Sequence, residues 1–273
     1  MAVTLQLPWA YAELPPNQPV PGGLATVILP VESEAAPEAR FGGRLVFVDH
    51  VDSKWVALVG LPCNIIPGNF ILSVSSPGEE HSSVEFGVLP PGSLTTLEKE
   101  GLEISQEITV TAQELPPGIT PSGVTNAAMS QDLMVEARRF SAIQSEHKFD
   151  PPVESRELVG YGSLISDEIS ECHDYLSYLT PPGNRVYAPA AGEVSAVPGM
   201  DNVNGTVVIA HGSQTFSILG NLEQILVEPG QWVDKGEVVG AAGGADIPTG
   251  GRVDWALVQN GYRVDPLRFA VPR

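Results

Sequence analysis

The segments His173-Asp174-Tyr175-Leu176-Ser177, Val186-Tyr187-Ala188-Pro189-Ala190-Ala191-Gly192-Glu193-Val194 and Gly250-Gly251-Arg252-Val253-Asp254-Trp255 decide the fold of the C-terminal half. Around them, short β-prone runs alternate with turn pairs such as Pro182-Gly183 and Asn204-Gly205. This alternation is typical of short antiparallel strands. The strands that we expect cover residues 186–197, 205–211, 215–219, 231–233, 237–241 and 252–257.

The N-terminal half shows the same alternation. Short β-prone runs follow a Pro-rich arm at residues 1–22, and Asp52-Ser53 separates two of them as a hairpin turn would. We expect an Ig-like β-sandwich over residues 23–115. Its expected strands cover residues 24–31, 44–48, 55–60, 69–75, 83–89 and 103–112.

Residues 116–148 are predicted to link the two halves. Ser130 could cap a helix at residues 130–145, in which apolar residues recur at helical spacing. A second β domain is expected over residues 149–273. The predicted fold class is therefore mainly β, with an N-terminal sandwich, a helical linker and a C-terminal antiparallel β domain.

The charge balance excludes some classes of partner. The 33 acidic and 14 basic residues give a formal net charge of −19, which repels nucleic acid and anionic membrane surfaces. No run of about 20 apolar residues is present, and the first 25 residues lack a basic region followed by an apolar core. We therefore expect no nucleic-acid binding, no transmembrane segment and no signal peptide in this sequence.

The chain has two cysteines, Cys63 and Cys172, far apart in sequence and in different predicted domains. Distant cysteines pair only where the fold brings them close together. We expect both to be buried as small apolar residues, with a bridge between them as the alternative.

The C-terminal half resembles two families. Biotinyl and lipoyl carriers share segments like residues 186–194 and 227–240, but they carry a modified lysine between the two halves. Here that stretch has no lysine, and Lys235 lies in a turn of the second half. Carrier function is therefore not expected.

The closer resemblance is to the lysostaphin-type (LytM-like) zinc endopeptidases, which cut peptide cross-links in bacterial peptidoglycan. It rests on residues 204–212, 227–240, 249–251 and 260–266, together with the three segments quoted above. Phe41-Gly42-Gly43-Arg44 and residues 57–62 also resemble the sandwich that precedes the peptidase domain in some proteobacterial members. The resemblance thus covers nearly the whole chain.

In active members of that family, the His and Asp of an HxxxD element and the second His of an HxH element hold zinc. A catalytic zinc needs about three protein ligands and an open position for water. The resemblance places the ligand positions on His173, Ser177 and Asp254, so His173 alone is unchanged. The two assisting histidine positions fall on Asn221 and Arg252. No catalytic group and no zinc cofactor are therefore expected to be intact.

The replacements suggest a specific local structure. Arg252 and Asp254 lie two apart on an expected strand, so both side chains should point to one face and form an ion pair. We hypothesise that this pair, joined by His173, fills the former zinc pocket. The competing reading is a divergent zinc site built from His173, Asp254 and Asp174 or a water.

Other histidines are expected to be structural or superficial. His211 ends a strand before Gly212 and is predicted to be a hydrogen-bonded core or turn histidine. His50, His81 and His147 show no metal-ligand spacing. Asp174, Tyr175 and Trp255 are candidates for lining a groove that would hold a peptide.

The resemblance implies a degenerate, non-enzymatic member of the family in the bacterial envelope, periplasmic or otherwise extracytoplasmic. Its expected partner is peptidoglycan or a cell-wall hydrolase. The alternatives are an active zinc metalloendopeptidase with altered ligands and a purely structural pairing module. The acidic surface favours a cationic protein partner over an anionic wall polymer.

Overall fold

The structure is a computed structural model that describes residues 15, 17–76, 81–91, 148–155, 157–162, 164–166, 169–195, 205–244 and 251–269. Within these ranges the chain forms β-strands and one short 3-10 helix, η1 (Pro266–Arg268). The prediction of a mainly β protein is confirmed. The predicted strand at 103–112 and helix at 130–145 lie outside the described residues. In the part that is described, no helix is long and apolar enough to cross a membrane.

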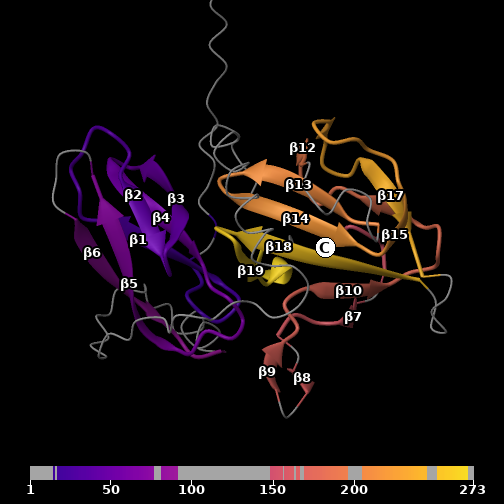
Figure 1. The fold of residues 1–273 in the computed structure, drawn as a ribbon, viewed down its shortest axis with the longest axis horizontal. Coiled ribbons are helices and arrows are strands. Elements are labelled where there is room, and N and C mark those ends of the chain that lie inside the picture. The colour runs from indigo at the N-terminus through magenta and orange to yellow at the C-terminus, as the bar shows by residue number, and fades with distance from the viewer. Residues whose placement is uncertain are drawn as a thin grey trace, which may run out of the picture.

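The N-terminal strands form one antiparallel sheet in the order β1-β4-β3-β2-β5-β6 (Figure 1). Its strands are β1 (Leu24–Leu29), β2 (Glu38–Phe41), β3 (Arg44–Val51), β4 (Lys54–Gly60), β5 (Gly68–Ser75) and β6 (Ser82–Val88). Residues 44–46 of β3 pair with β2, and residues 47–51 pair with β4. Strand β3 thus joins the two halves of the sheet, which enclose a common core. Phe41 lies in that core, with its ring edge-on to Phe70 and Phe86.

The hairpin predicted at Asp52-Ser53 is confirmed. Val51 pairs with Lys54, and the two residues between them have φ values of 48° and 65°. Positive φ at both central positions of a two-residue loop matches the right-handed twist of the flanking strands. Five of the observed strands overlap expected ones, whereas the short strand β2 has no counterpart among them.

The C-terminal strands form three sheets (Figure 1). The large sheet has the order β16-β12-β13-β14-β18-β10-β7, and β19 pairs with β18. Its strands are β7 (Glu157–Val159), β10 (Leu176–Leu179), β12 (Gly192–Val194), β13 (Val207–Gly212), β14 (Thr215–Gly220), β16 (Trp232–Val233), β18 (Arg252–Gln259) and β19 (Tyr262–Val264). The smaller sheets are made of β11 (Arg185–Tyr187), β17 (Val238–Ala242) and β15 (Leu222–Ile225), and of β8 (Leu164–Ser166) and β9 (Ile169–Cys172).

The single strand expected over residues 186–197 is wrong. The structure divides it into β11 and β12, which belong to different sheets. Pro189 lies between them, and proline cannot donate a ladder hydrogen bond. The chain therefore leaves one sheet at Tyr187 and enters the other at Gly192.

The two parts of the chain pack closely against each other. Leu24 and Leu58 of the N-terminal sheet belong to the main core of the C-terminal part, and Tyr262 of β19 belongs to the N-terminal core. Asn260 lies in the turn between β18 and β19, where its side-chain amide donates to Leu58 O and its oxygen accepts from Phe47 N at 3.1 Å. These contacts fix the two parts relative to each other.

Cys63 and Cys172 form a disulfide, so the expectation of two unpaired cysteines is wrong. Their Cα atoms lie 6.3 Å apart, within the range that a disulfide spans. The bridge joins the loop after β4 to the end of β9 and links the two parts covalently across 109 residues of sequence. Close packing of the two parts supplies the proximity that the sequence alone does not reveal.

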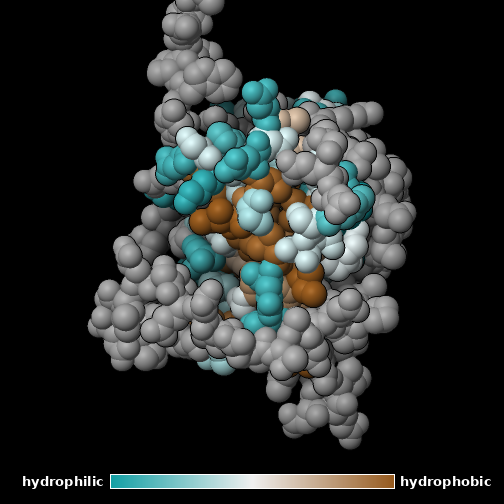
Figure 2. All heavy atoms as spheres, turned by 90° about the vertical axis from the view of Figure 1, so that its left-hand side faces the viewer, coloured by the Kyte–Doolittle hydropathy of each residue, from teal (hydrophilic) through white to brown (hydrophobic). Residues whose placement is uncertain are grey.

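The outer side of the N-terminal part shows hydrophobic residues bordered by hydrophilic ones (Figure 2). In this part, the large apolar side chains with substantial exposure are Ile28, Ile66 and Ile71. They lie on β1, on the loop before β5 and on β5. The family ligand positions named from the sequence lie elsewhere, in the C-terminal part.

Candidate functional site

The carboxylate of Asp254 is the centre of a polar cluster on β18. The hydroxyl of Ser177 donates to its Oδ1 at 2.6 Å, and the side-chain amide of Asn221 donates to its Oδ2. Nε of Arg252 forms an ion pair with Oδ1 at 3.1 Å. The predicted Arg252–Asp254 pair is thus confirmed, and four of the five positions named from the resemblance meet at one carboxylate.

Strand pairing explains why these residues meet. Ser177 on β10 lies directly opposite Asp254, and on the other side Asp254 lies opposite Gly220 at the end of β14. Asn221 follows Gly220 with φ of 62°, a left-handed conformation that asparagine tolerates better than most residues. The chain turns there from β14 into β15, and the Asn221 amide reaches the carboxylate from that turn.

His173 lies just before β10, close to Tyr175. Its ring contacts that of Tyr175 at a tilt of 43°, with centroids 3.8 Å apart, and only 8% of the residue is exposed. Its Nδ1 is buried and has no hydrogen-bond partner among the described residues. That His173 joins the Arg252–Asp254 pair stays a hypothesis; the hydrogen bonds to the Asp254 carboxylate come from Ser177 and Asn221.

Tyr175 lies between His173 and the Asp254 cluster. Burial raises the pKa of its hydroxyl, and the negative charge of Asp254 raises it further while Arg252 opposes the rise. The ring also packs against an apolar cluster on the same face of the sheet, formed by Val208, Ala210, Phe216, Ile218, Ala256 and Val258.

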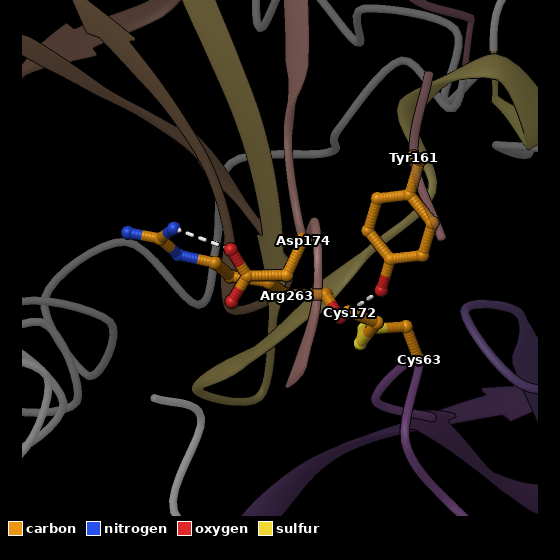
Figure 3. Close-up of a disulfide and its surroundings, with 5 residues drawn as sticks. All are labelled: Cys63, Tyr161, Cys172, Asp174 and Arg263. Carbon is orange, nitrogen blue, oxygen red and sulfur yellow. Dashed lines mark hydrogen bonds and ion pairs between the residues drawn. A yellow bond between two sulfur atoms is a disulfide. The ribbon is translucent and has the colours of Figure 1, made fainter. Parts of the chain in front are cut away.

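Asp174 points into a different set of contacts, shown in Figure 3. Its carboxylate forms a 2.8 Å ion pair with Nη1 of Arg263 on β19, and both side chains are largely buried. The hydroxyl of Tyr161 donates to Arg263 O at 2.8 Å, and burial raises the pKa of that hydroxyl. With the Cys172 disulfide directly before His173, these contacts hold the 172–175 segment against β19 and the N-terminal part.

The described residues do not fit a zinc ion. No group of three or more His, Cys, Asp and Glu side chains that could hold a metal occurs in the described ranges. The Asp254 oxygens already accept two hydrogen bonds, and the adjacent guanidinium of Arg252 would repel a divalent cation. The carboxylate of Asp174, a ligand in the divergent alternative, is paired with Arg263.

Of the candidates for lining a groove, Trp255 must be removed. Its side chain is completely buried in the main core, on the face of β18 opposite to Asp254, and its Nε1 donates to Ser217 Oγ at 3.2 Å. Alternation along a strand places neighbouring residues on opposite faces. Asp174 is buried in its ion pair, and Tyr175 alone of these candidates is partly exposed beside the site.

His211 is a structural histidine, as predicted. It is fully buried, with Nδ1 2.8 Å from Ala191 O and Nε2 2.9 Å from Ser217 Oγ. The carbonyl can only accept, so Nδ1 carries the proton, and the Ser217 hydroxyl donates to Nε2 while accepting from Trp255. Burial lowers the pKa of His211 to about 4, so the ring is neutral at pH 7.

The remaining residues agree with the expectations from sequence. His50 and His81 are exposed, and His147 lies outside the described residues. The Lys235 ammonium donates to Lys148 O at 2.9 Å and lies 3.4 Å from Asp150 Oδ1. It is thus engaged in contacts within the domain.

The sequence named four residues of the Asp254 cluster, but it gave the disulfide only as an alternative and did not indicate two other features around the cluster. The Asp174–Arg263 pair joins residues 89 apart, the disulfide joins residues 109 apart, and Tyr175 approaches Asp254 through the course of the chain after β9. No local pattern signals such contacts.

Comparison with known proteins now adds to this geometry. Residues 171–266 match peptidase family M23, and residues 17–90 match the N-terminal domain of peptidase family M23. A crystal structure of an M23 peptidase candidate from Pseudomonas aeruginosa is 29% identical, with a TM-score of 0.63, and the match covers 93% of this chain and 95% of that one.

Two curated relatives match over about 100 residues. An uncharacterized metalloprotease of Haemophilus influenzae is 32% identical over 101 residues, which are 37% of this chain and 21% of the relative. The peptidoglycan DD-endopeptidase ShyA of Vibrio cholerae is 28% identical over 100 residues, which are 37% of this chain and 23% of the relative. The chain thus covers less than a quarter of the length of these relatives. Together with the fold, the two domain matches show that the chain belongs to peptidase family M23, the lysostaphin-type family that the sequence resembles.

Proposed function

We propose that this protein binds the peptide part of peptidoglycan without zinc catalysis. The observation that supports this most strongly is the Asp254 cluster, in which Ser177, Asn221 and Arg252 engage the residue at a family ligand position. The arrangement satisfies the carboxylate without a metal, because hydrogen-bond donors and a guanidinium surround it. Peptidoglycan is the ligand suggested by the name of the relative ShyA.

We place this function outside the cytoplasm. Disulfides persist in oxidising compartments such as the bacterial periplasm and are rare where thiols are kept reduced. The Cys63–Cys172 bridge supports such a compartment, since it joins the two parts of the chain. The M23 relatives named as peptidoglycan endopeptidases point in the same direction.

A cationic cell-wall hydrolase is a second candidate partner, favoured by one observation. The formal net charge of −19 attracts a basic protein and speeds its encounter with this chain. In that case the chain regulates the hydrolase, and binding to isolated sacculi is absent or weak.

The test combines metal analysis, turnover and binding. Protein incubated with zinc and then desalted is analysed for bound metal, and cross-linked muropeptides are incubated with it, with and without a chelator. We expect no stoichiometric zinc and no cleavage, and we expect the protein to sediment with purified sacculi. The variant Arg252→Ala is tested in parallel, to show whether the guanidinium alone prevents zinc binding and cleavage.

Cleavage that a chelator abolishes would overturn the proposal and favour a zinc endopeptidase with altered ligands. Absence of sedimentation with sacculi, together with capture of a purified wall hydrolase, would favour the regulator. If the protein binds neither sacculi nor a wall hydrolase, the result would favour a purely structural pairing module.

A further inference from the structure

We propose that Arg252 is the centre of a binding site for the free carboxylate at the end of a peptide. The inference rests on the proposed function, because it names the group of the peptide that the site would hold. It assigns an anion to a position where an active family member would hold a cation.

Arg252 has donors available for a ligand. Its Nε is buried and forms an ion pair with Asp254 but no hydrogen bond, while 37% of the side chain is exposed. Among the described residues, its two Nη groups donate no hydrogen bond and form no second ion pair. A guanidinium held through Nε keeps an outer edge whose N–H groups match the two oxygens of a carboxylate.

The cluster fixes the orientation of this guanidinium. Oδ1 of Asp254 pairs with Nε and accepts from Ser177, and Oδ2 accepts from Asn221. Ser177 is 1% exposed, so water cannot easily replace Asp254 as the acceptor of its hydroxyl hydrogen bond. A side chain that is oriented before binding loses less conformational entropy when the ligand arrives.

His173 provides a second, independent indication of a ligand. It is more than nine-tenths buried, yet its Nδ1 has no partner in the described part of the chain. A buried polar atom without a hydrogen bond is costly, and such atoms occur where a ligand or water completes the contacts. Tyr175 connects His173 to the Asp254 cluster, since its ring contacts the His173 ring and packs on the face of β18 that carries Ala256 and Asp254.

Local charge favours a carboxylate over a larger anion. Arg252 and Asp254 are paired, as are Arg263 and Asp174, so these four groups sum to zero. A ligand with one negative charge can share the guanidinium with Asp254, whereas the second charge of a phosphate group would be repelled by it. Repulsion from the distant acidic surface is weak, because physiological salt screens exposed charges beyond about 8 Å.

The test uses acetyl-Ala-Ala with a free carboxylate and the same dipeptide as its carboxamide, titrated into the full chain by calorimetry. A hydrogen bond to a charged group contributes about 1.5–3 kcal/mol. The acid should therefore bind at least about tenfold more tightly than the amide. Inorganic phosphate should compete more weakly than acetate. Equal binding of acid and amide, stronger competition by phosphate, or no binding of either peptide would overturn the proposal.

Variants locate the site. Arg252→Gln should remove the preference for the acid, and Arg252→Lys should retain part of it without the bidentate geometry. Arg185→Gln, on the exposed part of β11, is the matched control and should bind as the wild type does. Should Arg252→Gln fail to fold, the comparison of acid with amide on the wild type still decides the question.

Two outcomes separate this inference from the proposed function. If the wild type and Arg252→Gln sediment equally with sacculi and neither prefers the acid, the protein binds peptidoglycan by another surface and the inference is wrong. If the acid binds through Arg252 but sacculi are not bound, the carboxylate site stands and the proposed ligand is wrong.

Discussion

Ser177 and Asp254 face each other directly across the β10–β18 ladder, and the serine hydroxyl donates to the carboxylate at 2.6 Å. Asn221 approaches the same carboxylate from the turn after β14, and Arg252 lies two residues before it on β18. Asp254 therefore connects β10, β14 and β18 at one end of the large sheet, where it has a structural role besides any role in binding.

Replacement of Asp254 by alanine should destabilise the protein by about 2 kcal/mol, because it leaves Ser177 and Asn221 without their common acceptor and Arg252 without its ion-pair partner. Urea denaturation followed by fluorescence measures the loss. Asp254→Asn keeps the shape and one acceptor oxygen and should lose less. Glu228→Ala, at an exposed turn, is the control. Equal stability of Asp254→Ala and the wild type would show that the cluster contributes nothing.

Reduction of the Cys63–Cys172 bridge should lower the free energy of unfolding by about 4 kcal/mol, because the bridge closes a loop of 109 residues in the unfolded chain. Thiol titration of the denatured, unreduced protein should find no free cysteine. The variant with Cys63→Ser and Cys172→Ser should match the reduced wild type and should not respond to a reductant. Two titratable thiols in the unreduced protein would disprove the bridge.

Asn260 should be important for the contact between the two parts. Its amide bonds to Leu58 O and Phe47 N across the interface, and its φ of 52° is left-handed. Asn260→Ala should destabilise the protein by about 3 kcal/mol, because it removes these hydrogen bonds and places alanine in a left-handed conformation. Asn260→Gly keeps the backbone freedom, so it isolates the loss of the amide and should cost about 2 kcal/mol. Denaturant titration compares them, and an alanine variant as stable as the glycine variant would show that the backbone conformation is unimportant.

The sequence predicted those parts of the fold that local chemistry determines. The Asp52-Ser53 turn was visible because short polar residues separate two β-prone runs, and the run at 252–257 became the core strand β18. The run at 186–197 misled because its apolar residues look continuous, although Pro189 ends one strand and the chain changes sheets. Strands β8 and β9 lie in a region with few apolar alternations and were not expected.

The candidate site was predictable where one strand or the resemblance places residues together. Arg252 and Asp254 lie two apart on β18, so their pairing followed from strand geometry. The contact between the His173 and Tyr175 rings did not follow, because it depends on how the chain leaves β9. The disulfide likewise depends on the packing of two domains, which no spacing of two cysteines can reveal.

The neutral His211 should make stability depend on pH. Its pKa is lowered to about 4 in the folded state by burial, against about 6.5 in the unfolded chain. Between these two values the unfolded state binds the extra proton, so stability falls as the pH falls from about 6.5 to about 4 and changes no further below that. The whole effect is about 3 kcal/mol.

His211→Asn isolates this dependence, because the asparagine amide can still donate toward Ala191 O but does not titrate. Both proteins share the titration of the carboxylates, so the difference between their unfolding free energies reports the histidine. The wild type should be the more stable protein at pH 7, and the difference between the two unfolding free energies should decrease by about 2 kcal/mol between pH 7 and pH 4.5. A gap that stays constant would mean that His211 is protonated in both states or in neither.

Restoring the family ligands should create zinc binding. Since Ser177 and Asp254 are directly opposite on neighbouring strands, Ser177→Asp and Asp254→His would place two ligands side by side, and Arg252→His removes the repelling charge. With His173 as the third ligand, this triple variant should bind zinc at one ion per chain, measured by metal analysis and by competition with a chromophoric chelator. Adding His173→Ala to it should abolish the binding. A folded triple variant that binds no more zinc than the wild type would show that His173 is out of reach of β18, and the resemblance would then misplace the first ligand.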